Sequence, residues 1–143
     1  MEDISLHVMD IVENSIRAGA TEVAIDIRED ENRDLLEVEI RDNGEGMDED
    51  MKRKALDPFY TSKENKRVGL GIPLLMQSAR EGGGTFALDS KPKGGTKITA
   101  TFVLSHPDRK PLGDLDGTVQ ILRFTHPEIQ FLYEYRKNTK VKE

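Results

Sequence analysis

Asp10-Ile11-Val12-Glu13-Asn14 is the first of two segments that determine this fold. The second, later in the chain, is Asp42-Asn43-Gly44-Glu45-Gly46. Asp10 and Asn14 are spaced i, i+4, so a helix places them on one face, about 40° apart. The far side of that helix is an apolar stripe to be buried, made of Ile4, Val8, Ile11, Val12 and the small Ser15. A carboxylate and a carboxamide one turn apart can order a water molecule and offer an oxygen to a hard cation. A solvated polar helix face is the alternative interpretation.

Composition limits the classes of protein that the chain can belong to. Its 143 residues suffice for one domain with a real core, and 36% hydrophobic with 34% charged residues is typical of a globular protein. The net charge of -6 argues against a duplex-binding surface. The absence of cysteine excludes disulfides, thiolate zinc sites and cysteine nucleophiles. No apolar run approaches the roughly 20 residues of a membrane span, and the acidic start lacks a signal-peptide core. We expect a cytoplasmic protein that binds neither nucleic acid nor membrane.

Periodicity predicts an alternation of helices and strands. Period-3.6 patterns predict helices at 3–18, 47–56 and 69–80, and period-2 patterns predict strands at 21–27, 35–40, 85–90 and 97–104. Residues 57–68 have no regular period and read as a mobile loop. The tail 105–143 is distinct, with a helix expected at 114–124 and a strand at 129–135.

Two glycine motifs stand where ligand loops are expected. Asp42-Asn43-Gly44-Glu45-Gly46-Met47 follows a strand, and its glycines permit turns and close backbone approach. Taken alone, it is as easily a plain turn, and it lacks the third glycine of a dinucleotide fingerprint. Val68-Gly69-Leu70-Gly71-Ile72 opens a helix, whose free N–H groups favour an anion such as phosphate. Lys63, just before it, could reach the same anion; a flexible connector with a solvated basic run is the alternative.

Joined in order, these pieces resemble the N, F and glycine boxes of the GHKL ATPase superfamily, which includes DNA gyrase, heat-shock chaperones, histidine kinases and MutL mismatch-repair proteins. The pieces are Asn14, Asp42-x-Gly44-x-Gly46, Asp57-Pro58-Phe59-Tyr60-Thr61-Ser62-Lys63, Gly69-Leu70-Gly71 and Gly95-Thr96. The resemblance covers residues 3–104. The Pro-Phe-Tyr-Thr-Ser-Lys and Gly-Leu-Gly-Ile pieces look most like those of histidine kinases. Segment 13–21 looks more like the corresponding segment of MutL proteins.

The resemblance implies a two-layer α/β sandwich of the Bergerat type, with a mixed, mostly antiparallel sheet and helices on one face. The ATP-binding domain would span 1–104, and 105–143 would be a tail extension packed on the same domain. The strand that usually precedes the first helix is missing here, so we expect strand 129–135 to return and fill that edge of the sheet. A dimer arm or a partner-binding arm is the alternative for this tail, and a homodimer would follow from the former.

The resemblance also implies a role for each matching residue. Asp10 stands where many relatives carry a glutamate general base, and Lys63, in an ATP lid at 57–68, would contact the γ-phosphate. The binding residues would be Asn14 for a Mg²⁺ ion that bridges the ATP phosphates, Asp42 for the adenine amino group, Gly44, Gly46 and Met47 around the base, Gly69, Leu70 and Gly71 for the phosphates, and Thr96 for the adenine end. Positioning and charge neutralisation by such a set are what phosphoryl transfer needs.

The function implied by the resemblance is Mg²⁺-dependent ATP binding with transfer of the γ-phosphoryl group to a partner protein in signalling, similar to anti-sigma-factor serine kinases. The chain begins on the first helix of the ATPase domain, so we expect the acceptor on another protein. His7 falls on the polar side of the first helix, where a structural or exposed role is favoured over a phosphoacceptor role. The alternative function is an ATP-gated switch or binding module that hydrolyses slowly or not at all.

Overall fold

The computed structural model describes residues 3–59 and 70–138. Their order along the chain is α1 (Ile4–Arg17), β1 (Glu22–Asp30), β2 (Leu35–Asp42), α2 (Glu49–Leu56), α3 (Gly71–Glu81), β3 (Phe86–Ser90), β4 (Thr96–Val103), α4 (Leu115–Thr125) and β5 (Gln130–Asn138). No helix among these is long and apolar enough to cross a membrane.

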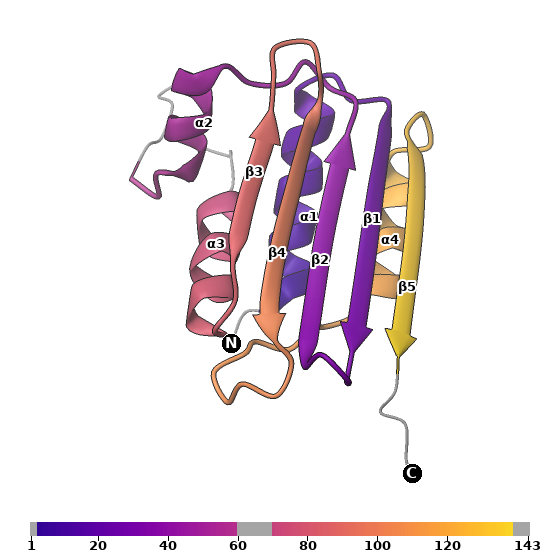
Figure 1. Ribbon diagram of the computed structural model, residues 1–143. Coiled ribbons are helices and arrows are strands. Elements are labelled where there is room, and N and C mark those ends of the chain that lie inside the picture. The colour runs from indigo at the N-terminus through magenta and orange to yellow at the C-terminus, as the bar shows by residue number, and fades with distance from the viewer. Residues whose placement is uncertain (1–2, 60–69, 139–143) are drawn as a thin grey trace.

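The strands form one mixed sheet in the order β3-β4-β2-β1-β5. Every neighbouring pair is antiparallel except β1 and β5, which run parallel. The helices lie on one side of this sheet and leave its other face open (Figure 1). The predicted two-layer α/β sandwich with a mostly antiparallel sheet is therefore confirmed.

Helix α1 buries the stripe that its sequence predicts. Asp3 caps its first turn by accepting the Leu6 N–H, and Gly19, just past its end, has a φ of +85° that favours glycine. The expected polar side is wrong at His7, which is buried with 1% exposed. The reason is that α3 approaches α1 very closely: a Cβ on Gly71 would lie 3.0 Å from the His7 carbonyl oxygen.

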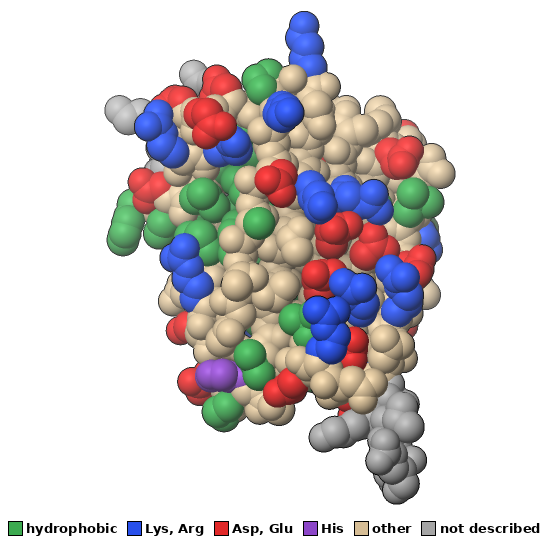
Figure 2. All heavy atoms as spheres, viewed as in Figure 1, with side chains coloured by type: hydrophobic (Ala, Val, Ile, Leu, Met, Phe, Trp, Pro, Cys, Tyr) green, Lys and Arg blue, Asp and Glu red, His purple; other side chains and the backbone are tan. Residues whose placement is uncertain are grey.

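The two faces of the sheet differ in chemistry because strand side chains alternate. The helix-facing positions form the core, for example Ile25, Val38 and Ile98. The open face carries interspersed Lys, Arg, Asp and Glu side chains (Figure 2), including an Arg28–Glu37 pair with a 2.8 Å N···O distance. β1 reaches Asp30, beyond its predicted end at residue 27, because β2 and β5 pair with it on both sides over that length.

The tail completes the sheet. Strand β5 lies beside β1 along its whole length, from the Gln130 N–H donated to the Thr21 carbonyl to the Glu31 N–H donated to the Asn138 carbonyl. The prediction that segment 129–135 returns to the sheet is thus confirmed. Helix α4 buries Leu115, Thr118, Val119 and Leu122. The tail therefore contributes to the core as well as to the sheet edge.

Candidate functional site

A cavity of about 410 Å³ lies where helices α1, α2 and α3 meet above the ends of β2 and β4. Its size falls in the usual range of small-molecule sites. Its apolar lining comes from the sheet and from the helices, and includes Ile11, Ile40, Met47, Ile72 and Ile98. Polar side chains enter this lining from α1 and from the end of β2. The arrangement suits a ligand with a flat apolar part and a charged part.

Asn14 and Asp42, which are far apart in the sequence, line this same cavity. Asn14 projects from α1, whereas Asp42 is the last residue of β2 and lies opposite Thr96 of β4. The roles expected for Asn14 and Asp42, at the two ends of one ATP molecule, require that both side chains reach the same cavity. The structure brings them together.

The Asp42 carboxylate is held from two directions. Its Oδ2 accepts a hydrogen bond from the Ser15 hydroxyl at 2.7 Å, and its Oδ1 accepts the Gly44 N–H at 2.9 Å. A carboxylate offers about four acceptor sites, so each oxygen retains capacity for a ligand N–H. This geometry makes Asp42 an oriented acceptor at one end of the cavity.

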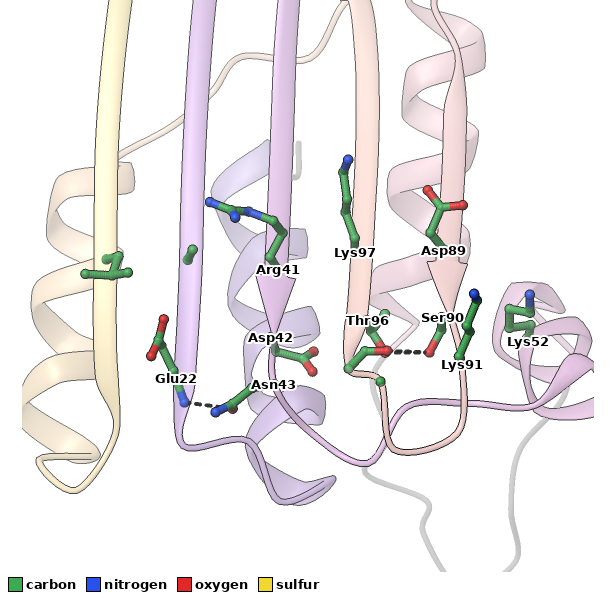
Figure 3. Close-up of a pocket in the computed structure, with 14 residues that line it drawn as sticks. Glu22, Arg41, Asp42, Asn43, Lys52, Asp89, Ser90, Lys91, Thr96 and Lys97 are labelled. Atoms are coloured by element: carbon green, nitrogen blue, oxygen red, sulfur yellow. Dashed lines mark hydrogen bonds between the residues drawn. The ribbon is translucent and has the colours of Figure 1, made fainter.

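The β3–β4 connection supports the same end. Gly95 has a φ of +73°, and a Cβ there would lie 2.2 Å from the Asp42 carbonyl oxygen, so only glycine permits this approach. The Ser90 hydroxyl contacts the Thr96 hydroxyl at 2.9 Å (Figure 3). It also accepts the Met47 N–H at 2.8 Å. Ser90 thereby ties the β3–β4 hairpin to the loop that follows Asp42.

Asn14 and Arg17 form the polar part of the α1 wall. The Arg17 Nη1 donates to the Asn14 Oδ1 at 3.1 Å, and both residues line the cavity. A carboxamide oxygen has two lone pairs, so Asn14 can accept from Arg17 and still offer an oxygen. No group of three or more His, Asp or Glu side chains suited to a metal occurs within residues 3–59 and 70–138. Mg²⁺ bound to a nucleotide needs only one or two oxygen ligands from the protein. The Asn14 side chain can provide one such oxygen.

The other predicted site residues fall into four groups. Gly46, Met47, Leu70 and Thr96 line the cavity. Gly44 orients Asp42, and Gly71 is buried against α1, where a Cβ would lie 2.8 Å from the Asp10 Cβ. Asp10 itself is exposed on α1 and is not one of the residues lining the cavity. Lys63 and Gly69 lie outside the described residues.

Three supporting residues were missed by the sequence analysis. Ser15 counted only as part of the apolar stripe, yet its hydroxyl holds Asp42. Arg17 stands i+3 from Asn14, a spacing that signals a shared helix face. Ser90 gave no signal, because its partners come from the hairpin end and from the Met47 loop.

A second, larger hollow of about 550 Å³ opens on the other side of the same sheet end. It shares Asp42 and Thr96 with the first cavity, but its remaining lining is mostly charged or polar, and Arg41, Lys97 and Asp89 project from the open face (Figure 3). Arg41 and Lys97 are engaged in ion pairs with Glu39. We therefore take the 410 Å³ cavity as the functional site.

The fold and this cavity define an ATPase domain of the GHKL type. Residues 2–106 match the model of the family described as "Histidine kinase-, DNA gyrase B-, and HSP90-like ATPase". The chain belongs to this family.

The sequence relatives include bacterial histidine kinases. The chain is 32% identical over 112 residues to the tetrathionate sensor histidine kinase TtrS of Salmonella typhimurium, covering 76% of this chain and 18% of that protein. It is 28% identical over 112 residues to the signal transduction histidine-protein kinase AfsQ2 of Streptomyces coelicolor, covering 75% and 20%. The chain thus spans about a fifth of the length of these curated relatives.

Solved structures confirm the fold. The N-terminal domain of a DNA repair protein superposes with a TM-score of 0.67 at 16% identity, covering all of this chain and 51% of that chain. The MutL ATPase domain of Aquifex aeolicus, complexed with ADP, gives a TM-score of 0.50 at 18% identity, covering 99% and 63%. At such identities the likeness concerns the fold alone.

Proposed function

We propose that the 410 Å³ cavity binds ATP with Mg²⁺ and that the chain transfers the γ-phosphoryl group to a partner protein in a signalling circuit. The observation that carries the proposal is the convergence of Asn14 and Asp42 on one cavity. Family membership supports ATP binding, and the histidine kinases among the relatives favour transfer to a protein over simple hydrolysis.

The adenine end is assigned to Asp42. A carboxylate accepts the N–H of the adenine amino group, whereas guanine presents a carbonyl oxygen at the same place and would be repelled. The fixed orientation from Ser15 and Gly44 means that little ordering cost is paid on binding. Met47 and Ile98 supply apolar contact for the faces of the ring.

The phosphate end is assigned to Asn14 and Arg17. The Asn14 side-chain oxygen would hold Mg²⁺, which would supply charge neutralisation for the transfer. The Arg17 guanidinium supplies a further positive charge in the cavity. Asp10, one helical turn before Asn14, is the residue proposed to accept a proton from the attacking group.

The alternative is an ATP-gated binding module with slow or no hydrolysis. The specific observation in its favour is that Asp10 is shorter than a glutamate and is not one of the residues that line the cavity. A side chain that is one methylene shorter reaches the attacking oxygen less readily. A general base must first lie within hydrogen-bond reach of the proton that it removes, whatever its pKa.

Binding is tested by isothermal titration with ATP and GTP, with Mg²⁺ and with a chelator. Asn14→Ala should lose most of the Mg²⁺-dependent gain in affinity, and Asp42→Asn should lose the preference for ATP over GTP. The exposed Asn32, in the turn after β1, provides the control Asn32→Ala, which should bind as the wild type does. Unchanged ATP affinity in both site variants would refute the assignment of the cavity.

Transfer of the γ-phosphoryl group is tested by incubating the chain with γ-labelled ATP and purified candidate partner proteins. Label on a protein partner that is lost in Asn14→Ala supports the kinase. Tight ATP binding without transfer or phosphate release supports the binding module. Asp10→Asn separates the roles further, because it should abolish transfer while leaving ATP affinity within a few-fold of wild type.

A further inference from the structure

The outer edge of β5 is a long strand edge. β5 pairs with β1 on one side and is the last strand of the sheet, and within the described residues no strand pairs with its other side. It has nine residues, and most of its side chains are exposed, including Leu132 at 47% and Tyr135 at 43%. Natural proteins usually shorten or cover such an edge, because its free N–H and C=O groups template pairing with another strand.

The hydrogen bonds of β5 show which of its backbone groups point outward. The Gln130 N–H donates to the Thr21 carbonyl just before β1, and the Asn138 carbonyl accepts the Glu31 N–H just after β1. The N–H and C=O of one strand residue point to the same side, and this side alternates from each residue to the next. The even-numbered residues of β5 therefore direct their backbone groups toward β1. Phe131, Tyr133, Tyr135 and Lys137 therefore present their backbone groups to the free edge. The Arg123 guanidinium already donates to the Phe131 carbonyl at 3.0 Å, which leaves the segment 133–137 for pairing.

The side chains of this segment are complementary to themselves. If two copies pair antiparallel about Tyr135, Tyr135 forms a hydrogen-bonded pair with its equivalent, and Tyr133 does so with the partner's Lys137. Glu134 then lies directly opposite the partner's Arg136, as a non-hydrogen-bonded pair whose Cα atoms are about 4.5 Å apart. Glu134 and Arg136 already form an exposed pair within one chain at 2.9 Å, so the two copies would create an alternating row of four charges.

The neighbouring registers are disfavoured by charge. Shifting the symmetry axis to residue 134 places Glu134 opposite the partner's Glu134, and shifting it to residue 136 places Arg136 opposite the partner's Arg136. Like charges directly opposite are destabilising. Of these three registers, only the one centred on Tyr135 satisfies both the outward backbone groups and the charges.

We propose that the free edge of β5 pairs antiparallel with β5 of a second copy of this chain, across a two-fold axis at Tyr135, so that the two sheets become one. Such an interface is isologous and closed, so it ends at a dimer. The 410 Å³ cavity lies at the β2 and β4 end of the molecule, away from β5, and remains open in the dimer. The proposal is therefore independent of the proposed function.

Charge reversal tests the register. In Glu134→Arg, both 134–136 pairs across the axis become arginine facing arginine, and in Arg136→Glu, both become glutamate facing glutamate. Sedimentation velocity from micromolar to millimolar protein should show a reversible wild-type dimer, and each single variant should weaken it about tenfold or more. An equimolar mixture of the two variants should restore association, because every arginine then faces a glutamate. Glu128→Arg, at an exposed site before β5, makes the same change in net charge as Glu134→Arg and should dimerise as the wild type does.

Amide hydrogen exchange on the wild-type chain gives a second readout that needs no variant. The amides of Tyr133, Tyr135 and Lys137 should gain protection as concentration rises, while those of Leu132, Glu134 and Arg136 should be protected throughout. A wild type that stays monomeric at millimolar concentration overturns the proposal. So does a dimer that survives both single variants, or a mixture that fails to associate while each variant melts as the wild type does.

Discussion

Replacing Ser15 with alanine should weaken ATP binding while leaving α1 in place. Ser15 is 7% exposed, and its hydroxyl lies 2.7 Å from the Asp42 Oδ2 and 3.2 Å from the Ile11 carbonyl oxygen. The shorter, charged contact takes the single proton. In Ser15→Ala the Asp42 carboxylate keeps only the Gly44 N–H as an orienting donor, so its side chain can rotate away from the position that reads the adenine amino group.

The size of the effect follows from the charge and exposure of Asp42. A hydrogen bond to a charged group contributes about 1.5–3 kcal/mol when buried, but Asp42 is only partly buried and water can replace the lost hydroxyl. We therefore expect a loss of about 1 kcal/mol, which corresponds to about a fivefold weaker affinity. Asp42→Asn, which removes the charge itself, should cost more than Ser15→Ala.

Isothermal titration with ATP measures this loss, and Ser5→Ala is the matched control. Ser5 is also a buried serine of α1, 5% exposed, and its hydroxyl donates to Asp3 at the start of the helix, away from the cavity. Ser5→Ala should lower the melting temperature without changing the ATP affinity. Equal affinity losses in Ser5→Ala and Ser15→Ala, or no loss in Ser15→Ala, would refute the positioning role of Ser15.

Two further predictions concern stability. Gly95→Ala should lower the free energy of unfolding by about 2 kcal/mol or more, since it combines a positive φ with an overlap on the Asp42 carbonyl. Gly94→Ala should lower it much less in urea unfolding, because Gly94 has no positive φ and its nearest neighbour to an added Cβ is the Lys91 Cβ at 3.3 Å. Burial and a hydrogen bond to Glu29 raise the pKa of Tyr135 from 10.0 to about 12, so the folded state holds this proton more tightly than the unfolded state. The resulting stability is present below pH 10 and lost as the pH rises to about 12. Tyr135→Phe should flatten that decline in thermal melts, and an unchanged alkaline profile would contradict it.

The elements of the fold could be predicted because each carries its own period. The stripe of α1 is an uninterrupted 3.6-residue pattern, and β2 and β4 alternate cleanly. The ends of strands were less predictable: β1 runs into Arg28, Glu29 and Asp30, since pairing on both sides outweighs the turn-like charge of that segment.

The site could be predicted in its outline but not in its support. Asn14 and Asp42 stand out by residue type and position, whereas the Ser15–Asp42 contact joins residues 27 apart and depends on how α1 crosses the sheet. Gly71 shows a deeper ambiguity. A glycine at a helix start can admit an anion or admit another helix, and both uses require the same missing Cβ; the structure shows the close contact with α1.

Helices α1 and α2, which form two walls of the cavity, differ in how much of their surface packs against the core. α1 contributes much of the core, whereas α2 has no buried residue and its ion pairs link neighbours within the same exposed helix. Such pairs contribute little, so α2 belongs to the least stable part of the described chain. Because Met51 and Ala55 of α2 line the cavity, a ligand there restricts the motion of this wall. Affinity and the position of α2 are therefore coupled, and a nucleotide that fills the cavity can transmit its presence to whatever contacts that helix.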